Sequence, residues 1–598
     1  MSSTQVLTKA KMLTAKGDYE RAEQLIMSVL VKFPKNKSAN QHLVKLAKKR
    51  ANKFGHAIEV QTDQLMELIK AYEKQDYETS IKISESLKQL YPEKFIIWML
   101  NAVSKRFLED YNGAFESFER ALRIDPDNAE LHYEIGLALQ ESGDNKNAFK
   151  SFYRSKLLNA KDGRPDNAIG LLYSKAQKYE QALDYYEQSI KCDPRESHAY
   201  NNASLSCNEL RLLDQSEKYV DKAIKLEPEV PEFYFNKAFV LALKCRPNEA
   251  LEEHDIAVNR ANEQNRPKLI EDFRFNDAII SLSSGLIDRG WESYRHRFES
   301  KDFPSRKRAF DRPRLENFEQ AKGKKILIWS EQGLGDEFMF LNLAKYFQQV
   351  TDCTYIMEGS FRVTSLIERA FPNADVRIPL YDRESDTMST TAKDYDYHMP
   401  YGHFPVLLNL KENDEHMIKC YLKADPELVN YWDAKLPKKK IRVGFSWRSQ
   451  LNTGIRQALY TKLNLWEELV ANDKYAFVSL QYGDISNDLN EIPEDFKKKI
   501  YMPEVDLKND LENVAAIMEA CDIIVAPQNA VLQQAAALGK TTITHTEPHG
   551  WTFLGRKQIY NKSSRHPFLK NNHTICYENT DQWNGIPKLV EEKLEELF

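Results

Sequence analysis

The loop GLGD combines the residue types that can bring a carboxylate close to a bound ligand. The residues before it, KILIW at 325–329, predict a buried strand, and the apolar spacing over 338–349 predicts a helix. Gly333 and Gly335 permit a tight turn and a close approach of the backbone to a ligand. Asp336 would then lie at the helix N-terminus, where an ionised carboxylate is favoured. It could take a proton from a hydroxyl group, or simply cap the helix.

A second strand, loop and helix is predicted near the C-terminus. The residues DIIVA at 522–526 predict a strand, and a helix is predicted from Ala530 to Leu538, ended by Gly539. The free N–H groups at such a helix start can bind a diphosphate. The residues expected around this anion are Gln528, Asn529, Ala530 and Val531.

Two arginines follow another predicted strand, IRVGFSW at 441–447. Arg448 and Arg456 could neutralise a diphosphate in a site without a metal ion, or could be solvated surface charges. His549 follows the predicted strand at 541–544. It either lines the ligand-binding cleft that these loops would form or is solvated.

These motifs belong to a region in which strands and helices alternate. Further strands are expected at 354–357 and 476–481. Alternation of this kind predicts parallel sheets covered by helices on both faces. We place one lobe at 323–430 and a second at 431–598, after a polar linker at 301–322.

The first 300 residues contain an internal repeat with a period of 34. One series contains small residues, as needed where two helices cross closely, and another marks the stop after each second helix. The small residues are Ser80, Ala114, Ala148, Ala182, Ser216 and Ala250. The stop series is Pro92, Pro126, Ala160, Pro194 and Pro228, with Gly136 and Gly170 earlier in their units.

This repeat resembles the tetratricopeptide repeat (TPR), and the resemblance covers roughly residues 5–300. Asn202 and Asn236 each occupy the sixth position of their repeat, which faces the groove in TPR proteins. O-GlcNAc transferase, a fusion of TPR repeats and a glycosyltransferase, uses a ladder of such Asn residues. The resemblance implies that both amides bind the backbone of an acceptor peptide. A passive spacer is the alternative.

The segment EQGLGDEFMF resembles bacterial TPR-fused glycosyltransferases related to the heptosyltransferases. The implied fold is an all-α TPR superhelix followed by an α/β GT-B fold of two Rossmann-like lobes. The resemblance implies that Asp336 is the catalytic base and that Gly333, Gly335, Arg448, Arg456, Gln528, Asn529, Ala530, Val531 and His549 bind the donor. Gln533 stands where similar transferases carry His, which is a departure from the pattern.

The expected function is therefore transfer of a sugar from a nucleotide-sugar donor to a protein acceptor, with flagellin as one acceptor known for such fusions. We expect an inverting enzyme that needs no metal or other cofactor, since the DxD pair Asp394 and Asp396 lacks a metal-site context. Two alternatives stay open: a TPR scaffold whose transferase domain has lost catalysis, and a lipopolysaccharide-type sugar transferase.

Composition restricts the partners and the compartment. A formal net charge of −5 gives no basic surface for nucleic acid. The sequence has no signal-peptide pattern and no long apolar stretch, so we expect a cytoplasmic protein without a membrane span. None of the seven cysteines forms a CxxC motif, which favours a reducing compartment and gives no support to a zinc site.

Overall fold

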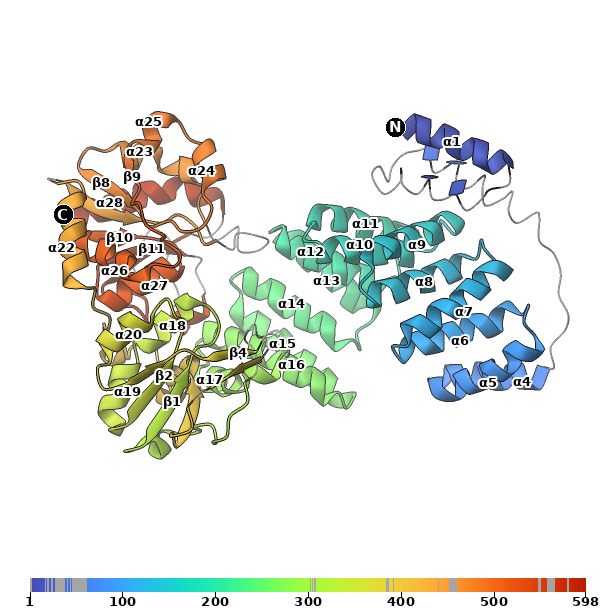
Figure 1. Ribbon diagram of the computed structural model, residues 1–598, viewed down its shortest axis with the longest axis horizontal. Coiled ribbons are helices and arrows are strands. Elements are labelled where there is room, and N and C mark those ends of the chain that lie inside the picture. Colours follow the sequence, from blue (N-terminus) through green and yellow to red (C-terminus); the bar gives the residue numbers. More distant parts are fainter. Residues whose placement is uncertain are drawn as a thin grey trace. The chain divides into compact units, whose positions relative to one another are not determined.

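The structure, a computed structural model, describes residues 3–16, scattered residues between 18 and 45, and residues 62–598 with short gaps. The gaps are at 302, 304, 306–307, 383–386, 391, 439, 451–459, 547–549, 556–564 and 578–579. The chain divides into two compact units, Met1–Pro228 and Glu229–Phe598. The described part of the first unit contains only helices, whereas the second contains helices and strands (Figure 1).

The first unit is an array of antiparallel helix pairs. Its described helices are α1 (Ser3–Lys16), α4 (Thr62–Glu73), α5 (Tyr77–Leu90), α6 (Phe95–Phe107), α7 (Tyr111–Ile124), α8 (Ala129–Glu141), α9 (Asn145–Leu158), α10 (Arg164–Lys175), α11 (Tyr179–Cys192), α12 (Ser197–Glu209) and α13 (Leu213–Leu226). The period of 34 is confirmed, because each predicted small residue within α5, α7, α9, α11 and α13 is the fourth residue of its helix and is fully buried. The Pro series follows two residues after these helices end.

Two glycines on first helices allow the closest helix contacts. A Cβ atom on Gly136 would lie 2.5 Å from the ring of Phe152, and one on Gly170 would lie 2.5 Å from the ring of Tyr186. Both aromatic rings are buried on the second helix of the same repeat. The repeat therefore places an aromatic ring directly against a glycine backbone, which accounts for the Gly positions in the sequence pattern.

We expect Gly170→Ala to destabilise the first unit by about 1–3 kcal/mol, because the new methyl group would overlap the Tyr186 ring. This loss outweighs the gain of roughly 1 kcal/mol in helix propensity. Urea unfolding of the full chain, followed by circular dichroism, measures the change. In a Tyr186→Leu background the same substitution should cost much less. An increase in stability from Gly170→Ala alone would contradict the close packing.

Four more helices of the array lie in the second unit: α14 (Pro231–Leu243), α15 (Pro247–Glu263), α16 (Pro267–Ser283) and α17 (Ile287–Arg295). Leu282, Trp291 and Tyr294 belong to the same buried apolar cluster as the α/β region. The Trp291 indole N–H also donates to the Leu410 carbonyl oxygen at 2.8 Å. This shared core explains why the compact unit begins at Glu229, before the end of the array.

Two residues of the segment expected to be a linker contact the first sheet. Leu315 is fully buried, and its N–H donates to the His398 carbonyl oxygen at 2.9 Å. Arg308 forms a buried ion pair with Glu358. The polar composition of residues 301–322 thus reflects buried ion pairs and surface positions together, and the described part of this segment is not a free spacer.

The first sheet is parallel, with strand order β3-β2-β1-β6. Its strands are β1 (Lys325–Trp329), β2 (Thr354–Glu358), β3 (Asp375–Arg377) and β6 (Tyr397–Pro400), and β4 (Leu380–Asp382) pairs separately with β5 (Thr387–Ser389). The helices here are α18 (Leu334–Leu341), α19 (Ala344–Thr351), α20 (Thr364–Ala370), α21 (Phe404–Leu408) and α22 (Pro426–Lys435). Short 3-10 helices are η1 (Arg297–Glu299), η2 (Phe318–Ala321), η3 (Tyr401–His403) and η4 (Glu415–Met417).

The single helix predicted over 338–349 is interrupted in the structure. α18 ends at Leu341 and α19 begins at Ala344. The intervening Asn342 donates from Nδ2 to the Phe568 carbonyl oxygen at 3.1 Å, and its own carbonyl oxygen accepts the Lys419 N–H at 2.8 Å. These tertiary hydrogen bonds explain a break that apolar periodicity does not reveal.

The second sheet is also parallel, in the order β12-β11-β10-β7-β8-β9. Its strands are β7 (Ile441–Phe445), β8 (Tyr475–Ser479), β9 (Ile500–Tyr501), β10 (Ile523–Val525), β11 (Thr542–Thr546) and β12 (Asn572–Cys576). The surrounding helices are η6 (Leu463–Trp466), α23 (Glu467–Ala471), α24 (Ser486–Asn490), α25 (Glu494–Lys497), α26 (Leu511–Ala520), α27 (Ala530–Leu538), η7 (Trp551–Phe553), η8 (Thr580–Gly585) and α28 (Ile586–Leu597).

If β7 to β12 are renumbered 1 to 6 and the sheet is taken from β9 to β12, the strand order is 3-2-1-4-5-6. Doubly wound dinucleotide-binding sheets have this order, and they bind ligands where the order reverses. Here that point lies between the carboxyl ends of β7 and β10. The predicted parallel α/β region is confirmed.

Candidate functional site

The first wall of the candidate site is the turn from β1 into α18. Gly333 is the N-cap residue, and its N–H donates to Oδ2 of Asp336 at 3.2 Å. Asp336 is therefore the third residue of the helix and is partly exposed. A carboxylate in this place is stabilised by the first-turn N–H groups.

A buried ion pair supports this turn from behind. The Arg297 guanidinium donates to both carboxylate oxygens of Glu331, at 2.9 and 2.6 Å, and both side chains are fully buried. Glu331 Oε1 also accepts the N–H of Gly402 at 2.7 Å, just after β6. Glu331 thus joins the ends of β1 and β6, where the order of the first sheet reverses.

The second wall is the start of α27. Asn529 caps this helix, because its Oδ1 accepts the N–H of Leu532 at 3.2 Å. Its Nδ2 donates to Ser446 Oγ at 3.0 Å and to the Arg448 carbonyl oxygen at 3.3 Å. A single Asn side chain therefore fixes the helix start and ties together the loops that follow β7 and β10. The predicted helix from Ala530 to Leu538 is confirmed, as is its end at Gly539 with φ of +88°.

The two walls meet closely at Gly335. A Cβ atom on Gly335 would lie 3.4 Å from Ala530 Cα and 3.5 Å from the Ala530 nitrogen. The absence of a side chain lets the start of α18 approach the start of α27. The segment GLGD at 333–336, called the Gly-Asp loop from here on, therefore lies next to Ala530 at the start of α27.

A cavity of about 570 Å³ lies between these walls. It is lined by Gly333, Leu334, Gly335, Asp336, Met339, Arg362, Ser449, Gln450, Tyr460, Tyr482, Leu507, Lys508, Leu511, Val514, Gln528, Asn529, Ala530, Val531, Gln533, Gln534, Trp551 and Thr552. A volume of this size suits a cofactor-sized ligand, and the lining combines apolar and aromatic surfaces with a few polar groups.

The structure brings most of the predicted site residues together. Seven of them line the cavity: Gly333, Gly335, Asp336, Gln528, Asn529, Ala530 and Val531. Arg448 does not line it, because its guanidinium forms an ion pair with Asp488 and donates to the Asp484 carbonyl oxygen at 2.7 Å. Arg456 and His549 lie outside the described residues.

Among the described residues, the cations that line the cavity are Arg362 and Lys508, which sequence reasoning missed. Arg362 Nε donates to Ser360 Oγ at 3.2 Å, and its Nη1 donates to the Lys508 carbonyl oxygen at 3.3 Å. Each lies in a loop without a recognisable motif. Arg362 follows β2, at the carboxyl edge of the sheet where ligands bind, and this position could have indicated a role in the site.

Two further polar groups of the site are buried without hydrogen-bond partners. Gln533 lines the cavity and is 8% exposed, and its Oε1 atom has no partner. Glu337 follows Asp336 in α18 and is 4% exposed, and its Oε1 atom also lacks a partner. Burial raises the pKa of Glu337 to about 8, against a smaller lowering effect of Arg362.

The carboxylates of the DxD pair, Asp394 and Asp396, both bind groups of the protein itself. Asp394 pairs with Lys325 and Arg377, and Asp396 accepts the Lys325 N–H at 2.9 Å. The expectation of a site without a metal ion rests on the sequence and stays a prediction.

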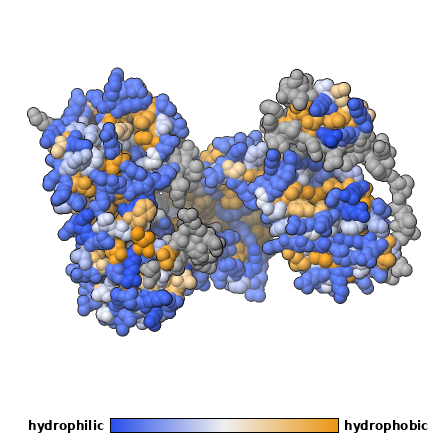
Figure 2. All heavy atoms as spheres, in the orientation of Figure 1, coloured by the Kyte–Doolittle hydropathy of each residue, from blue (hydrophilic) through white to orange (hydrophobic). Residues whose placement is uncertain are grey.

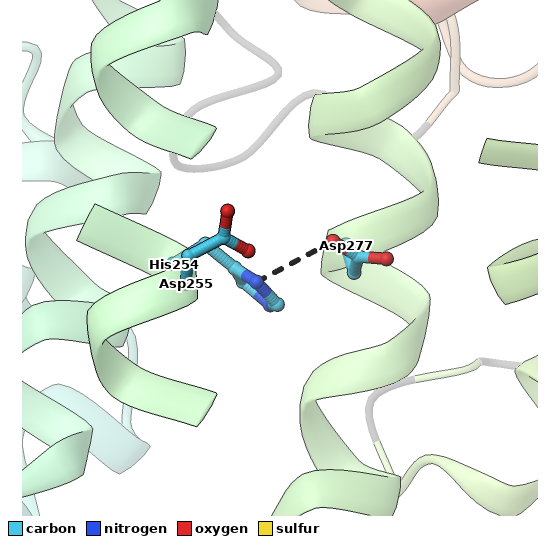
Figure 3. Close-up of side chains that lie close together, drawn as sticks. All are labelled: His254, Asp255 and Asp277. Carbon is cyan, nitrogen blue, oxygen red and sulfur yellow. Dashed lines mark ion pairs between the residues drawn. The ribbon is translucent and has the colours of Figure 1, made fainter. Parts of the chain in front are cut away.

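Among the described residues, His254 and Asp255 on α15 and Asp277 on α16 also form a group with metal-ligand spacing (Figure 3). His254 Nδ1 lies 3.4 Å from Asp277 Oδ1, but Arg289 Nη2 donates to both carboxylates at 2.5 Å. Burial lowers the pKa of His254, and Arg289 adds to this effect against the raising effect of Asp277. The ion pairs with Arg289 account for the two carboxylates without a bound ion.

The two predicted acceptor residues lie on first helices of the array, in different units. Asn202, on α12, is partly exposed, and its Nδ2 donates to Asn167 Oδ1 at 2.9 Å. Asn236, on α14, is also partly exposed. Both are the sixth residue of their helix, as the repeat pattern predicts.

No helix within the described residues is both long and apolar enough to cross a bilayer. In Figure 2, hydrophilic residues cover much of the visible face of each unit, with hydrophobic residues between them.

Residues 108–143 match a family model described as TPR repeat, and residues 167–231 match one described as tetratricopeptide repeat. The chain is 29% identical over 347 residues to Protein FlbA of Caulobacter vibrioides, covering 54% of this chain. It spans 56%, about half, of the length of that relative.

Two solved structures are also similar in part. MamA from Desulfovibrio magneticus RS-1 is 19% identical, with 29% of this chain and 97% of that chain covered and a TM-score of 0.26. YrrB, a TPR protein with an unusual peptide-binding site, is 17% identical. The similarity covers 31% of this chain and 94% of that chain, with a TM-score of 0.25. Such scores are too low to add to the fold assignment, which rests on the helix pairs and the family models. The chain therefore contains TPR repeats within residues 108–143 and 167–231.

Proposed function

We propose that this protein transfers a sugar from a nucleotide-sugar donor to a protein acceptor that its repeats bind. The observation that carries the proposal is the cavity at the carboxyl edges of two parallel sheets, with the Asp336 carboxylate on one wall and the α27 N-terminus on the other. A carboxylate facing an anion-binding helix start suits a reaction that deprotonates a hydroxyl group and releases a diphosphate.

In the proposed reaction, the acceptor hydroxyl oxygen forms a bond to the anomeric carbon of the sugar. The bond from that carbon to the diphosphate oxygen breaks, and its electron pair leaves with the nucleoside diphosphate. Asp336 takes the hydroxyl proton. The N–H groups at the start of α27 and the cations Arg362 and Lys508 line the cavity and would stabilise the departing charge.

The nucleoside half of the donor would contact the aromatic and apolar residues of the lining. Tyr460 and Tyr482 follow β7 and β8, and Leu507, Leu511 and Val514 supply apolar surface nearby. Such aromatic and apolar surfaces suit a flat base, while the polar groups of the cavity suit phosphates and sugar hydroxyls. The lining of this one cavity thus offers groups suited to each half of the proposed donor.

The TPR repeats support a protein acceptor, since stacked helix pairs build extended surfaces that bind polypeptides. A bacterial flagellin is one acceptor of the proposed class. The Asn residues contribute less than the sequence pattern predicts, because Asn202 already donates to Asn167. An acceptor backbone would have to replace that bond in order to use the Asn202 amide.

A thermal-shift panel with UDP, GDP, ADP and CMP, and with sugars attached to each, tests the donor site. A nucleotide present at 100 times its Kd should stabilise the protein by about 2.7 kcal/mol. The double variant Arg362→Met/Lys508→Met should weaken this response, because it removes two cations that line the cavity. A matched double variant of the surface residues Lys498 and Lys499 controls for lost positive charge. No response to any nucleotide would contradict the proposal.

A second candidate is a TPR scaffold whose α/β region no longer catalyses transfer. The pairing of Arg448 with Asp488 favours it, because this cation is neutralised within the protein rather than directed at a ligand. A nucleotide that binds but is never turned over with any protein acceptor would support the scaffold.

A further inference from the structure

Gln332, immediately before Gly333, has a left-handed backbone with φ of +57°. Residues other than Gly rarely adopt this conformation, because the Cβ atom crowds the neighbouring carbonyl oxygen. Such a conformation persists where surrounding groups hold it in place, and it is often found at functional sites. Since Gln332 leads directly into the Gly-Asp loop, whatever holds it also sets the position of Asp336.

Two groups hold Gln332. Its Nε2 donates to the Tyr294 hydroxyl oxygen at 2.7 Å, and its backbone N–H donates to Ser305 Oγ at 2.6 Å. Tyr294 belongs to α17, the last helix of the repeat array, and is 1% exposed. The side chain of Gln332 is therefore anchored to the array and not to the sheet that carries the loop.

The same tyrosine also contacts the other wall of the cavity. Its ring stacks on Trp551, with centroids 5.8 Å apart and an interplanar angle of 27°, and Trp551 lines the cavity. The Arg297 guanidinium lies 4.4 Å from the centroid of the Tyr294 ring and is fixed by Glu331. One residue of the array thus contacts the residue before the Gly-Asp loop and an aromatic side chain of the opposite wall.

We propose that Tyr294 is a positioning residue that holds Gln332 in its left-handed conformation, so that the last helix of the array sets the Gly-Asp loop. The consequence for transfer by Asp336 rests on the proposed function; the structural effect on the loop does not. On this view α17 contributes to the site, and removal of this helix of the array would disturb the position of the Asp336 carboxylate.

Hydrogen exchange of the segment 329–340 in the full chain tests the structural effect. Tyr294→Phe keeps the ring stack and removes the hydroxyl, and we expect about fivefold faster exchange in this segment, the equivalent of one ordinary hydrogen bond. Adding Gln332→Gly should restore slow exchange, because glycine adopts positive φ without support. Tyr355→Phe, which removes another buried hydroxyl of the same lobe, should leave the segment unchanged.

Turnover of a nucleotide sugar is the second measurement in this test. Tyr294→Phe should lower kcat about fivefold with little change in KM for the donor, and Tyr294→Phe/Gln332→Gly should recover it. Unchanged exchange in Tyr294→Phe, or a failure of Gln332→Gly to restore it, would overturn the positioning role. If the wild-type protein binds no nucleotide, the transferase proposal fails, while the exchange arm still decides the role of Tyr294.

Discussion

Asp336→Ala is expected to lower sugar transfer by about 10²- to 10⁴-fold, the usual contribution of a general base, while nucleotide binding is retained. Asp336 lines the cavity, and its Oδ2 accepts the Gly333 N–H at 3.2 Å. The carboxylate therefore combines a local structural bond with a position from which it can take a proton. The measurement is release of nucleoside diphosphate from a nucleotide sugar that stabilises the wild-type protein, with acceptor present.

Asp336→Asn separates the two roles of this residue. The Asn Oδ1 atom can still accept the Gly333 N–H, so the helix start should stay formed, but the amide cannot act as a base at neutral pH. We expect this variant to bind nucleotide and unfold like the wild-type protein, yet to lose transfer as Asp336→Ala does. Substantial turnover by Asp336→Asn would show that the carboxylate only caps the helix, and another base would then be needed.

The repeats and the motifs flanked by strands were predictable because their signals are local. A period of 34 fixes which small residues are buried, and the six that define it are each 0% exposed. A strand followed by glycines or by an Asn cap places a helix start at the edge of a sheet. Those rules were sufficient to bring Asp336 and residues 528–531 to one cavity.

The features that sequence reasoning missed depend on contacts between distant residues. Arg448 follows a strand, as a ligand-binding cation would, but Asp488, forty positions further on, takes its guanidinium. Arg362 and Lys508 lie in loops whose approach to the cavity depends on how the two lobes pack. Spacing along the chain carries no information about such pairings, since any surface carboxylate can compete for an arginine.

Helix α17 shows most clearly that the sequence does not reveal contacts between distant residues. The segment GWESYRHRF, at 290–298, lies at the end of the region that resembles the repeat, and nothing in it indicates contact with the Gly-Asp loop. In the structure, Tyr294 and Arg297 from this motif contact Gln332 and Glu331. The last helices of the array and the α/β region thus share one hydrophobic core. A domain boundary placed near residue 300 from sequence composition cannot reveal this shared core.

Glu337→Gln is expected to change how stability depends on pH. Burial raises the pKa of Glu337 from 4.5 to about 8, so between these values the folded protein holds a proton that the unfolded chain has released. Folding stability should therefore fall as pH rises through this window, by up to about 1.4 kcal/mol per pH unit. The neutral Gln side chain removes this dependence.

The variant and the wild-type protein should be similar in stability near pH 4, where Glu337 is protonated in both states. Above pH 8 the variant should be more stable by an amount on the order of 3–5 kcal/mol. Urea unfolding of the full chain at pH 5, 7 and 9 measures the difference, with exposed Glu368→Gln as the control for loss of one surface carboxylate. Parallel pH profiles would show that Glu337 is ionised in the folded state. The outcome bears on the site, because a protonated Glu337 leaves the charge of Arg362 available to a ligand phosphate, whereas an ionised one would compete for it.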